Sequence, residues 1–348
     1  MCLFDNNFER IYNMKKRTLG LLLTVCTIFS MLAGCSSCSP SNSIHSNDKN
    51  TSTTTINIGC MKGPTGIGMI KLLSDSDNSK TDNNYNYTIA GTADEISTAL
   101  IKEDLDIAAV PCNLASVLYN KTEGEIVTVA INTLGVLYIV EAGQTINSVT
   151  DLKGKTIYST GQGTTPEYTL RYLLTSAGLD PDKDVNIQYK SEASEVVATL
   201  STDNGAVAML PQPYVTVATN SNKNLRIALD VTAEWEKLSK DSTVVTGVLV
   251  ARKSFIEENQ DAFNLFLNEY QLSTQYANEH VEDTAILIEE FDIFKAAIAK
   301  KAIPYCNVTF ISGTEMKTKA LAYLQVLYDQ NPKAVGGKLQ EGMFYIEK

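Results

Sequence analysis

Apolar and polar segments alternate along the chain from residue 56 onward, and the alternation predicts strands and helices in turn. Short apolar runs at 56–61 and 156–159 each meet a glycine-containing loop, and a segment with helical spacing follows each loop. A polar stretch, a second helix and a strand that ends at proline come next in both places. Such alternation is typical of parallel sheets that helices cover on both faces. We therefore expect an α/β fold.

The two arrays are related by an internal repeat with an offset of 100 residues. Residues 92–118 align without gaps with 192–218, and upstream of them Gly63 aligns with Gly163. Further matched pairs are Thr65/Thr165, Leu100/Leu200, Ala108/Ala208 and Pro111/Pro211. Many matches fall on residues that shape loops, which predicts two similar lobes with mostly parallel sheets flanked by helices.

Two further extended segments, 133–140 and 245–251, both contain Gly-Val-Leu and enclose the second array. We expect them to cross between the lobes as two hinge strands. Lobe 1 would then comprise 56–135 and 247–348, and lobe 2 would comprise 136–246. Helical periodicity is also present at 254–278, 282–301 and 313–328.

The start of the chain has the pattern of a targeting sequence. Lys15, Lys16 and Arg17 precede an apolar run at 19–33, which is shorter than the roughly 20 residues that span a bilayer and typical of a secretory signal peptide. We expect a leader at 1–34; whether Met14 is the true start stays open. The Ser, Thr and Asn residues that dominate 35–55 predict a disordered tether.

Composition excludes several functional classes. A chain of 348 residues with 44% hydrophobic residues is long enough for about two domains with real cores. Its net charge of −11 argues against nucleic acid as a partner, because that binding needs a basic surface. Removal of the leader would make the chain more acidic, since the leader holds more basic than acidic residues.

Histidine and cysteine usage argues against catalysis. Of the two histidines, His45 lies in the expected tether, so only His280 could serve a folded site, and a surface position is the simpler interpretation. Cys60, Cys112 and Cys306 are the cysteines of the folded region, and they lack C-x-x-C spacing. We expect no metal, no cofactor and no catalytic residue; whether any disulfide forms stays open.

The loops after the predicted strands are the candidate ligand site, because ligands gather beyond the carboxyl ends of parallel strands. Neither glycine-rich loop is a nucleotide motif: the first lacks the Lys-Ser/Thr of a P-loop, and Pro166 stands where a dinucleotide fingerprint has its third glycine. The side chains that could contact a ligand are Lys62, Thr65, Asn113, Thr164, Thr165, Gln212 and Tyr214. Lys62 could equally be a surface amine, and Tyr214 could stack on a planar ligand or simply pack.

The second glycine-rich loop leads into a well-marked helix. Thr165 is expected to be the N-cap, Pro166 suits the first turn and Gly178 ends the helix. Glu167 and Arg171 have the spacing of an exposed ion pair on this helix. Trp235 could border the site or lie in the core.

The string Leu32-Ala33-Gly34-Cys35 resembles the lipobox of bacterial lipoproteins. The resemblance implies cleavage before Cys35 and attachment of diacylglycerol to its sulfur. The protein would then be extracytoplasmic and anchored to the cell membrane by lipid alone. An ordinary signal peptide with a chance cysteine is the alternative.

The mature chain resembles the substrate-binding lipoproteins of ABC importers, in the branch for nitrate, taurine, aliphatic sulfonates and the pyrimidine precursor of thiamine. Strings that carry this resemblance over 56–345 are Lys62-Gly63-Pro64-Thr65-Gly66, Asp106-Ile107-Ala108-Ala109-Val110-Pro111, Asp151-Leu152-Lys153-Gly154-Lys155 and Leu210-Pro211-Gln212-Pro213, with Pro332 to Lys338 near the end. It implies a two-lobed periplasmic binding protein fold of type II. It also implies delivery of a small ligand to an ABC permease and its ATPase, without catalysis.

The resemblance also implies which residues bind the ligand. They are Lys62, Gly63, Pro64, Thr65, Gly66, Pro111, Cys112, Asn113, Gly161, Gln162, Gly163, Thr164, Thr165, Gln212 and Tyr214. Gln212 stands where many members carry Glu, and no arginine lies in these loops, so a bidentate clamp on a sulfonate is not evident. A small neutral or weakly anionic, heteroaromatic ligand fits best. Two alternatives remain: a ligand sensor for a signalling partner, and an enzyme on the same fold similar to the yeast-type pyrimidine synthase.

Overall fold

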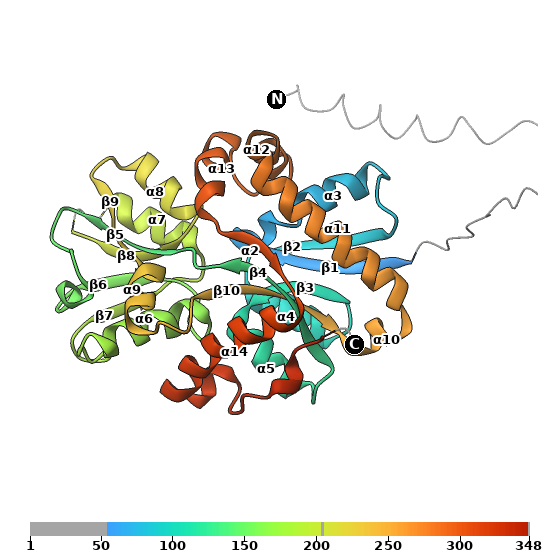
Figure 1. Ribbon diagram of the computed structural model, residues 1–348. Helices are drawn as coiled ribbons and strands as arrows, with labels where there is room; N and C mark the ends of the chain where they lie inside the picture. Colours follow the sequence, from blue (N-terminus) through green and yellow to red (C-terminus); the bar gives the residue numbers. More distant parts are fainter. Residues whose placement is uncertain (1–53, 203–204, 347–348) are drawn as a thin grey trace, which may run out of the picture. The chain divides into compact units, whose positions relative to one another are not determined.

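The computed structural model describes residues 54–202 and 205–346, which belong to one compact unit, Thr51–Lys348 (Figure 1). The expected leader, Cys35 and nearly all of the expected tether lie outside the described residues. In the described part, no helix is both long and apolar enough to span a membrane.

Strands in the described residues form two sheets. The first has the order β11-β4-β10-β3-β1-β2. Its strands are β1 (Thr55–Met61), β2 (Asn84–Ala90), β3 (Ile107–Pro111), β4 (Ile126–Leu134), β10 (Val245–Arg252) and β11 (Val308–Ile311). The second sheet has the order β7-β6-β8-β5-β9. Its strands are β5 (Leu137–Ala142), β6 (Thr156–Ser159), β7 (Asn186–Tyr189), β8 (Val207–Pro211) and β9 (Leu225–Asp230).

Both sheets are mixed, which corrects the expectation of mostly parallel sheets. β1 runs parallel to β2 and β3, and β6 runs parallel to β7 and β8. β10 is antiparallel to β3 and β4, β11 is antiparallel to β4, and β5 is antiparallel to β8 and β9. After each crossing between the sheets the chain continues as β5 or β10, and each of these strands runs opposite to the neighbouring strand of the repeat, β8 or β3. The α/β class with two helix-flanked sheets is confirmed.

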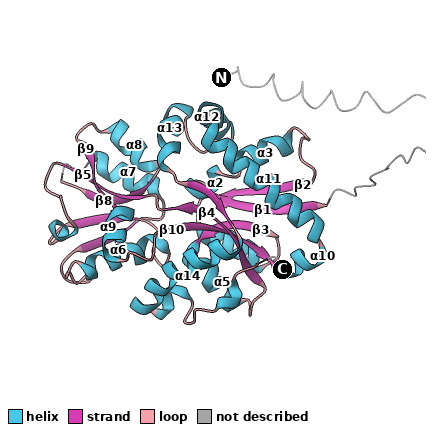
Figure 2. Cartoon of the chain, in the orientation of Figure 1, coloured by secondary structure: helices cyan, strands magenta, loops and turns pink. Residues whose placement is uncertain are grey.

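Helices connect the strands and cover the sheets (Figure 2). The α-helices are α2 (Pro64–Ile67), α3 (Ile70–Asp77), α4 (Ala93–Ile101), α5 (Cys112–Lys121), α6 (Thr165–Ser176), α7 (Ala193–Thr202), α8 (Tyr214–Ser221), α9 (Val231–Leu238), α10 (Lys253–Glu258), α11 (Gln260–Glu279), α12 (Val281–Glu290), α13 (Ala296–Ala302) and α14 (Gly313–Gln330). Short 3₁₀ turns are η1 (Val149–Leu152), η2 (Ile303–Tyr305), η3 (Pro332–Val335) and η4 (Glu341–Met343).

The helices expected at 254–278 and 282–301 are each divided in two. Asn259 separates α10 from α11, and Asp292, with a left-handed φ of 53°, lies between α12 and α13. The helix expected at 313–328 is confirmed as α14, although it extends to Gln330. Periodicity therefore located the helical regions but not the breaks within them.

The 100-residue repeat is visible in the topology. β2-β1-β3 and β7-β6-β8 have the same order, and each set is followed by an antiparallel strand, β10 or β5. The matched prolines occupy matching places: Pro111 pairs with Gly247 of β10, and Pro211 pairs with Leu137 of β5. The two copies thus share one architecture.

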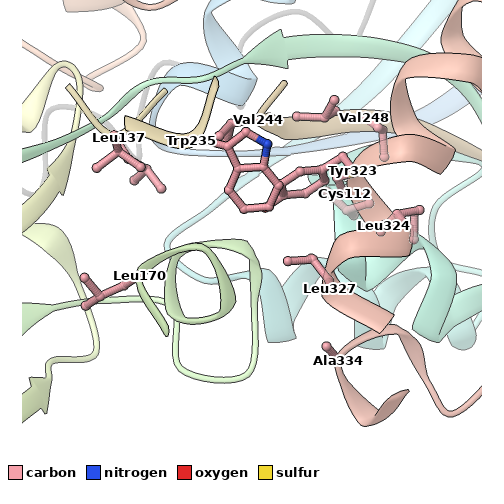
Figure 3. Close-up of a cluster of buried hydrophobic side chains, with 14 of the residues drawn as sticks. Cys112, Leu137, Leu170, Trp235, Val244, Val248, Tyr323, Leu324, Leu327 and Ala334 are labelled. Atoms are coloured by element: carbon pink, nitrogen blue, oxygen red, sulfur yellow. The ribbon is translucent and has the colours of Figure 1, made fainter. Parts of the chain in front are cut away.

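One hydrophobic core is continuous across both sheets (Figure 3). It combines Leu137, Leu170 and Trp235 with Val248 and with residues of α14 such as Tyr323. Trp235 is fully buried between Tyr172 and Tyr323, so it is a core residue. Separate clusters cover the opposite face of each sheet: α3 and α11 contribute to the first, and α7 and α8 to the second. Cys60, Cys112 and Cys306 are buried and form no disulfide with one another, a question that the sequence leaves open.

The chain passes from the first sheet to the second between Leu134 and Leu137. Gly135 is required there, because a Cβ atom at this position would lie 1.8 Å from Thr232 Oγ1. The expected extended segment 133–140 is interrupted at Gly135, where the Thr232 side chain approaches the backbone closely, and is not a single strand.

Candidate functional site

The loop after β1 turns sharply into the short helix α2. Gly63 has φ 151° and ψ −163°, a conformation that is open almost only to glycine. Gly63, Pro64, Thr65 and Gly66 are buried, whereas Lys62 is exposed and its Nζ donates to Asp292 O at 3.3 Å. The loop therefore offers its threonine, not its lysine, to the interior.

Polar side chains without partners gather around this loop. Thr65 is 3% exposed, and its Oγ1 makes no hydrogen bond; Asn132 donates through Nδ2 to Thr65 O at 3.1 Å, while its Oδ1 has no donor. Gly247 lies against both, since a Cβ atom there would be 2.5 Å from Thr65 Cγ2 and 2.6 Å from Asn132 Oδ1. Buried polar atoms normally have partners, so these atoms are candidates for ligand contact.

Thr133 and Thr246 extend this group, because their Oγ1 atoms are also buried without a partner. Both lie where β4 and β10 meet the passage between the sheets. Sequence reasoning missed Asn132, Thr133 and Thr246. The available signal was that polar residues interrupt the apolar crossing segments at 132–133 and 246.

The predicted residues of the loop after β3 lie in two environments: Cys112 is in the hydrophobic core, and Asn113 is in a hydrogen-bond network. Cys112 is buried beside Tyr323 in the shared core (Figure 3), and burial raises the pKa of its thiol. Asn113 is 0% exposed and is bonded on both sides of its amide: Nδ2 donates to Ala334 O at 2.9 Å and to Gly163 O at 3.3 Å, and Oδ1 accepts from Thr165 Oγ1 at 3.2 Å. Asn113 thus joins the first-sheet loop to the second-sheet loop.

The polar groups of the loop after β6 have partners both within this region and in Asn113. Gly161 and Gly163 have left-handed φ angles of 72° and 76°. Thr164 is the N-cap of α6, which corrects the expectation for Thr165, and its Oγ1 donates to Gly161 O at 2.8 Å instead of accepting from the helix. Gln162 is exposed. The helix ends as expected before Gly178, which has φ 79°.

Glu167 and Arg171 do not form the expected ion pair. Glu167 Oε2 accepts from Gly163 N at 2.7 Å, and Arg171 forms a bidentate pair with Asp182 at 2.9 and 2.8 Å. Because Gly163 has a left-handed conformation, its N–H points to the first turn of α6 and binds the Glu167 carboxylate in place of Arg171.

The loop after β8 contains the cis Gln212–Pro213 bond. Gln212 is buried; its backbone N donates to Val136 O at 3.0 Å, and its Oε1 accepts from Thr216 Oγ1 at 2.8 Å. Tyr214 packs edge-on against Phe294 with ring centroids 5.0 Å apart. The ring therefore packs against a side chain that precedes α13.

Arginine does not contribute to these loops. The arginines among the described residues are Arg171, Arg226 and Arg252, and each pairs with a carboxylate elsewhere: Asp182, Glu141, and Glu103 with Asp106. The described part also contains no group of three or more metal-binding side chains. His280 is exposed, as expected, and stacks on Tyr276 with ring centroids 4.5 Å apart.

The structure brings Asn113, Gly163 and Thr165 together and places Thr65 among unpartnered polar atoms. Lys62, Gln162 and Tyr214 do not join these clusters. Two cavities of about 490 and 260 Å³ are lined by other residues, the first between α3 and α11 and the second between α6 and the end of α14. Ligand binding by the loop residues stays a prediction.

A family model described as "ABC transporter, phosphonate, periplasmic substrate-binding protein" matches residues 78–264. A solved structure of an ABC transporter from Parabacteroides distasonis is 26% identical, with a TM-score of 0.70, and the match covers 85% of this chain and 100% of that one. Among curated proteins, no sequence matches the chain.

Two more distant structures show the fold alone. The periplasmic aliphatic sulphonate-binding protein of Escherichia coli is 16% identical with a TM-score of 0.69, covering 85% of this chain and 94% of its own. The periplasmic nitrate-binding protein of Synechocystis is 13% identical with a TM-score of 0.61, covering 80% and 82%. Both belong to the branch that the sequence resembles.

Proposed function

Because the chain belongs to the phosphonate periplasmic substrate-binding protein family of ABC transporters, we propose that it captures one small solute between its two lobes and passes it to a membrane permease driven by an ATPase. The lobes are 56–135 with 247–348, and 136–246. The loops after β1, β3, β6 and β8 supply the ligand contacts.

The observation that carries this proposal is the set of unpartnered buried oxygens at the passage between the sheets. Thr65, Thr133 and Thr246 each have a hydroxyl without a partner, and Asn132 has a free carbonyl oxygen. A ligand that supplies hydrogen bonds would remove the cost of leaving these groups unpaired, which is about 1–3 kcal/mol each. These groups carry no charge.

The ligand is neutral or weakly anionic. Every arginine in the described part is paired outside the loops, and Lys62 is exposed and directed to Asp292 O. A fully ionised phosphonate or sulfonate would need the charge-assisted hydrogen bonds that such residues provide. In this proposal the half-buried ring of Tyr214, which packs edge-on against Phe294, also stacks on a heteroaromatic solute.

A binding role without catalysis agrees with the chemistry of the reactive groups. Burial raises the pKa of the thiols of Cys60, Cys112 and Cys306, which disfavours the nucleophilic thiolate. His280 lies on the surface between α11 and α12. These features favour a binding role over a histidine- and cysteine-dependent synthase reaction.

A lipid on Cys35 anchors the receptor outside the cell membrane. The lipobox-like string before Cys35 supports this. Labelling cells with an alkyne analogue of palmitate should mark the wild-type protein and leave a Cys35→Ser variant unmarked. Equal labelling of the wild type and the variant would contradict lipid attachment at Cys35.

Thermal-shift screening of the purified protein tests the receptor role. Pyrimidines, purines, small carboxylates, sulfonates and phosphonates would be compared at equal concentrations. A bound ligand raises the midpoint because only the native state binds it. The proposal predicts a shift for at least one uncharged or weakly anionic compound, and a flat response across a broad library would contradict it.

A further inference from the structure

Glu167 supplies a carboxylate to the glycine-rich loop of lobe 2. It lies in the first turn of α6, is half-buried, and its Oε2 accepts from Gly163 N at 2.7 Å. A carboxylate in the first turn is also favoured by the partial positive charge of a helix N-terminus. The contact therefore occupies the Gly163 N–H, which could otherwise donate a hydrogen bond to a solute.

Other groups of the loop are occupied as well. Gly163 O accepts from Asn113 Nδ2, Gly161 O accepts from Thr164 Oγ1, and the Thr165 hydroxyl donates to Asn113. Four residues of the loop thus have protein partners.

The negative charge of Glu167 is offset only at a distance, by the Arg171 guanidinium. Arg171, one turn further along α6, is bonded through NH2 to both oxygens of Asp182, and Glu167 is in no ion pair of the described residues. Burial and the Glu167 carboxylate together raise the pKa of Tyr189, and the same carboxylate contributes to the raised pKa of Arg171. The loop thus has a local negative charge.

The carboxylate is specific to the second copy of the repeat. The residue 100 positions earlier is Ile67, which is fully buried in the core of lobe 1. The first copy therefore has no carboxylate at this place, and the second copy adds a negative charge there.

We propose that Glu167 is a specificity-determining residue that makes this receptor reject fully ionised phosphonates and sulfonates. It binds the Gly163 N–H and places a carboxylate without an ion-pair partner on the lobe 2 side of the site, where an anion would be repelled. The inference rests on the proposed function, because it assumes that the solute lies between the two lobes.

Isothermal titration with methylphosphonate and methanesulfonate tests this on the wild type, Glu167→Ala and Glu167→Gln. The wild type is expected to give no measurable binding. Glu167→Ala removes the charge and frees the N–H, so it should bind at least one anion at least tenfold more tightly. Glu167→Gln removes only the charge and should show a smaller gain, and raised salt should weaken both gains.

Glu195→Gln is the matched control. Glu195 lies in the first turn of α7 of the same lobe and is exposed, and its backbone oxygen accepts from Thr199 Oγ1. It removes one negative charge without touching Gly163, so it should leave anion binding unmeasurable. A gain equal to that of Glu167→Gln would overturn the specific role of Glu167.

The remaining outcomes separate this inference from the proposed function. If both Glu167 variants unfold cooperatively and still reject the anions, the inference is wrong and the receptor role stands. If the wild type binds methylphosphonate as tightly as Glu167→Ala, the inference and the uncharged ligand are both wrong. If Glu167→Ala fails to fold, Glu167→Gln decides the matter, and no gain would overturn the inference.

Discussion

The loops at 62–66 and 161–165 occupy corresponding places in two copies of one repeat, yet they differ in how their polar groups are bonded. Thr65 and Thr165 are matched residues, 3% and 0% exposed. The hydroxyl of Thr65 has no partner, whereas that of Thr165 donates to Asn113. The threonine occupies the same position in both copies of the repeat, but its hydroxyl has a hydrogen-bond partner only in the second copy.

The difference arises from elements outside the repeated loops. Thr65 lies against Asn132 and Gly247 of the strands that lead between the sheets. Thr165 donates to Asn113, which lies in the first turn of α5 in the other lobe. We infer that lobe 1 provides most of the free hydrogen-bonding groups for a solute and that the lobe 2 loop mainly holds the lobes together.

The largest effect on stability is expected from Asn113→Ala, which removes the hydrogen bonds between the loop after β3 and the loop after β6. The substitution removes a fully buried amide and leaves Ala334 O, Gly163 O and the Thr165 hydroxyl without it, so the free energy of unfolding should fall by about 2–4 kcal/mol. Urea denaturation measures the change. Asn120→Ala is the control: Asn120 also donates to carbonyls near η3 but is only half-buried, and a loss as large as that of Asn113→Ala would contradict the account.

The next effect concerns the matched glycines of the two loops, Gly63 and Gly163. Gly63→Ala forces alanine into a region open almost only to glycine and should cost about 2 kcal/mol. Gly163→Ala meets the smaller left-handed penalty, about 1 kcal/mol, since its φ is 76°. Neither Cβ atom would contact a neighbour, so backbone conformation alone sets both costs. Thermal unfolding should rank them in this order, and the reverse order would show that the loops are not strained as described.

Matched threonine substitutions sharpen the comparison. Thr165→Val loses a buried hydrogen bond to Asn113 and should lower the free energy of unfolding by about 1 kcal/mol. Thr65→Val removes a hydroxyl without a partner and should not lower stability, yet affinity for the solute should fall about tenfold. Denaturation and ligand titration of both variants measure this. Equal behaviour of the two would mean that the loops are equivalent.

The smallest effect is expected from Lys62→Met. Lys62 is exposed and its contact with Asp292 O is 3.3 Å long, so stability should change by less than about 0.5 kcal/mol. Solute affinity should change by less than about twofold, because an uncharged solute does not need the ammonium group. A large, salt-dependent loss of affinity in titrations would restore Lys62 as a ligand residue and indicate an anion.

Much of the fold could be predicted from the sequence because local patterns encode it. Apolar runs, prolines and glycines at an offset of 100 residues were enough to indicate two similar α/β units with matching loops. The breaks at Asn259 and Asp292 were missed, since helical periodicity continues across them. The antiparallel direction of β10 and β5 depends on how the chain passes between sheets, which periodicity does not report.

The candidate site was less predictable because its bonds join residues far apart in the sequence. Asn113 bonds Ala334 and Gly163, and Asn132 bonds Thr65; no spacing rule pairs these residues. Glu167 has helical spacing to Arg171 but bonds backward to Gly163, because a left-handed glycine turns its N–H toward the helix. The positions of the loops could be predicted from the sequence, whereas the hydrogen-bond partners of their polar atoms could not.

Native mass spectrometry of wild type and Thr65→Val, purified side by side from the natural host, tests the central claim most directly. The account predicts that the wild type carries one small molecule per chain, that this molecule has no phosphonate or sulfonate group, and that Thr65→Val carries much less of it. A bound phosphonate or sulfonate, or equal occupancy in both proteins, would contradict the account.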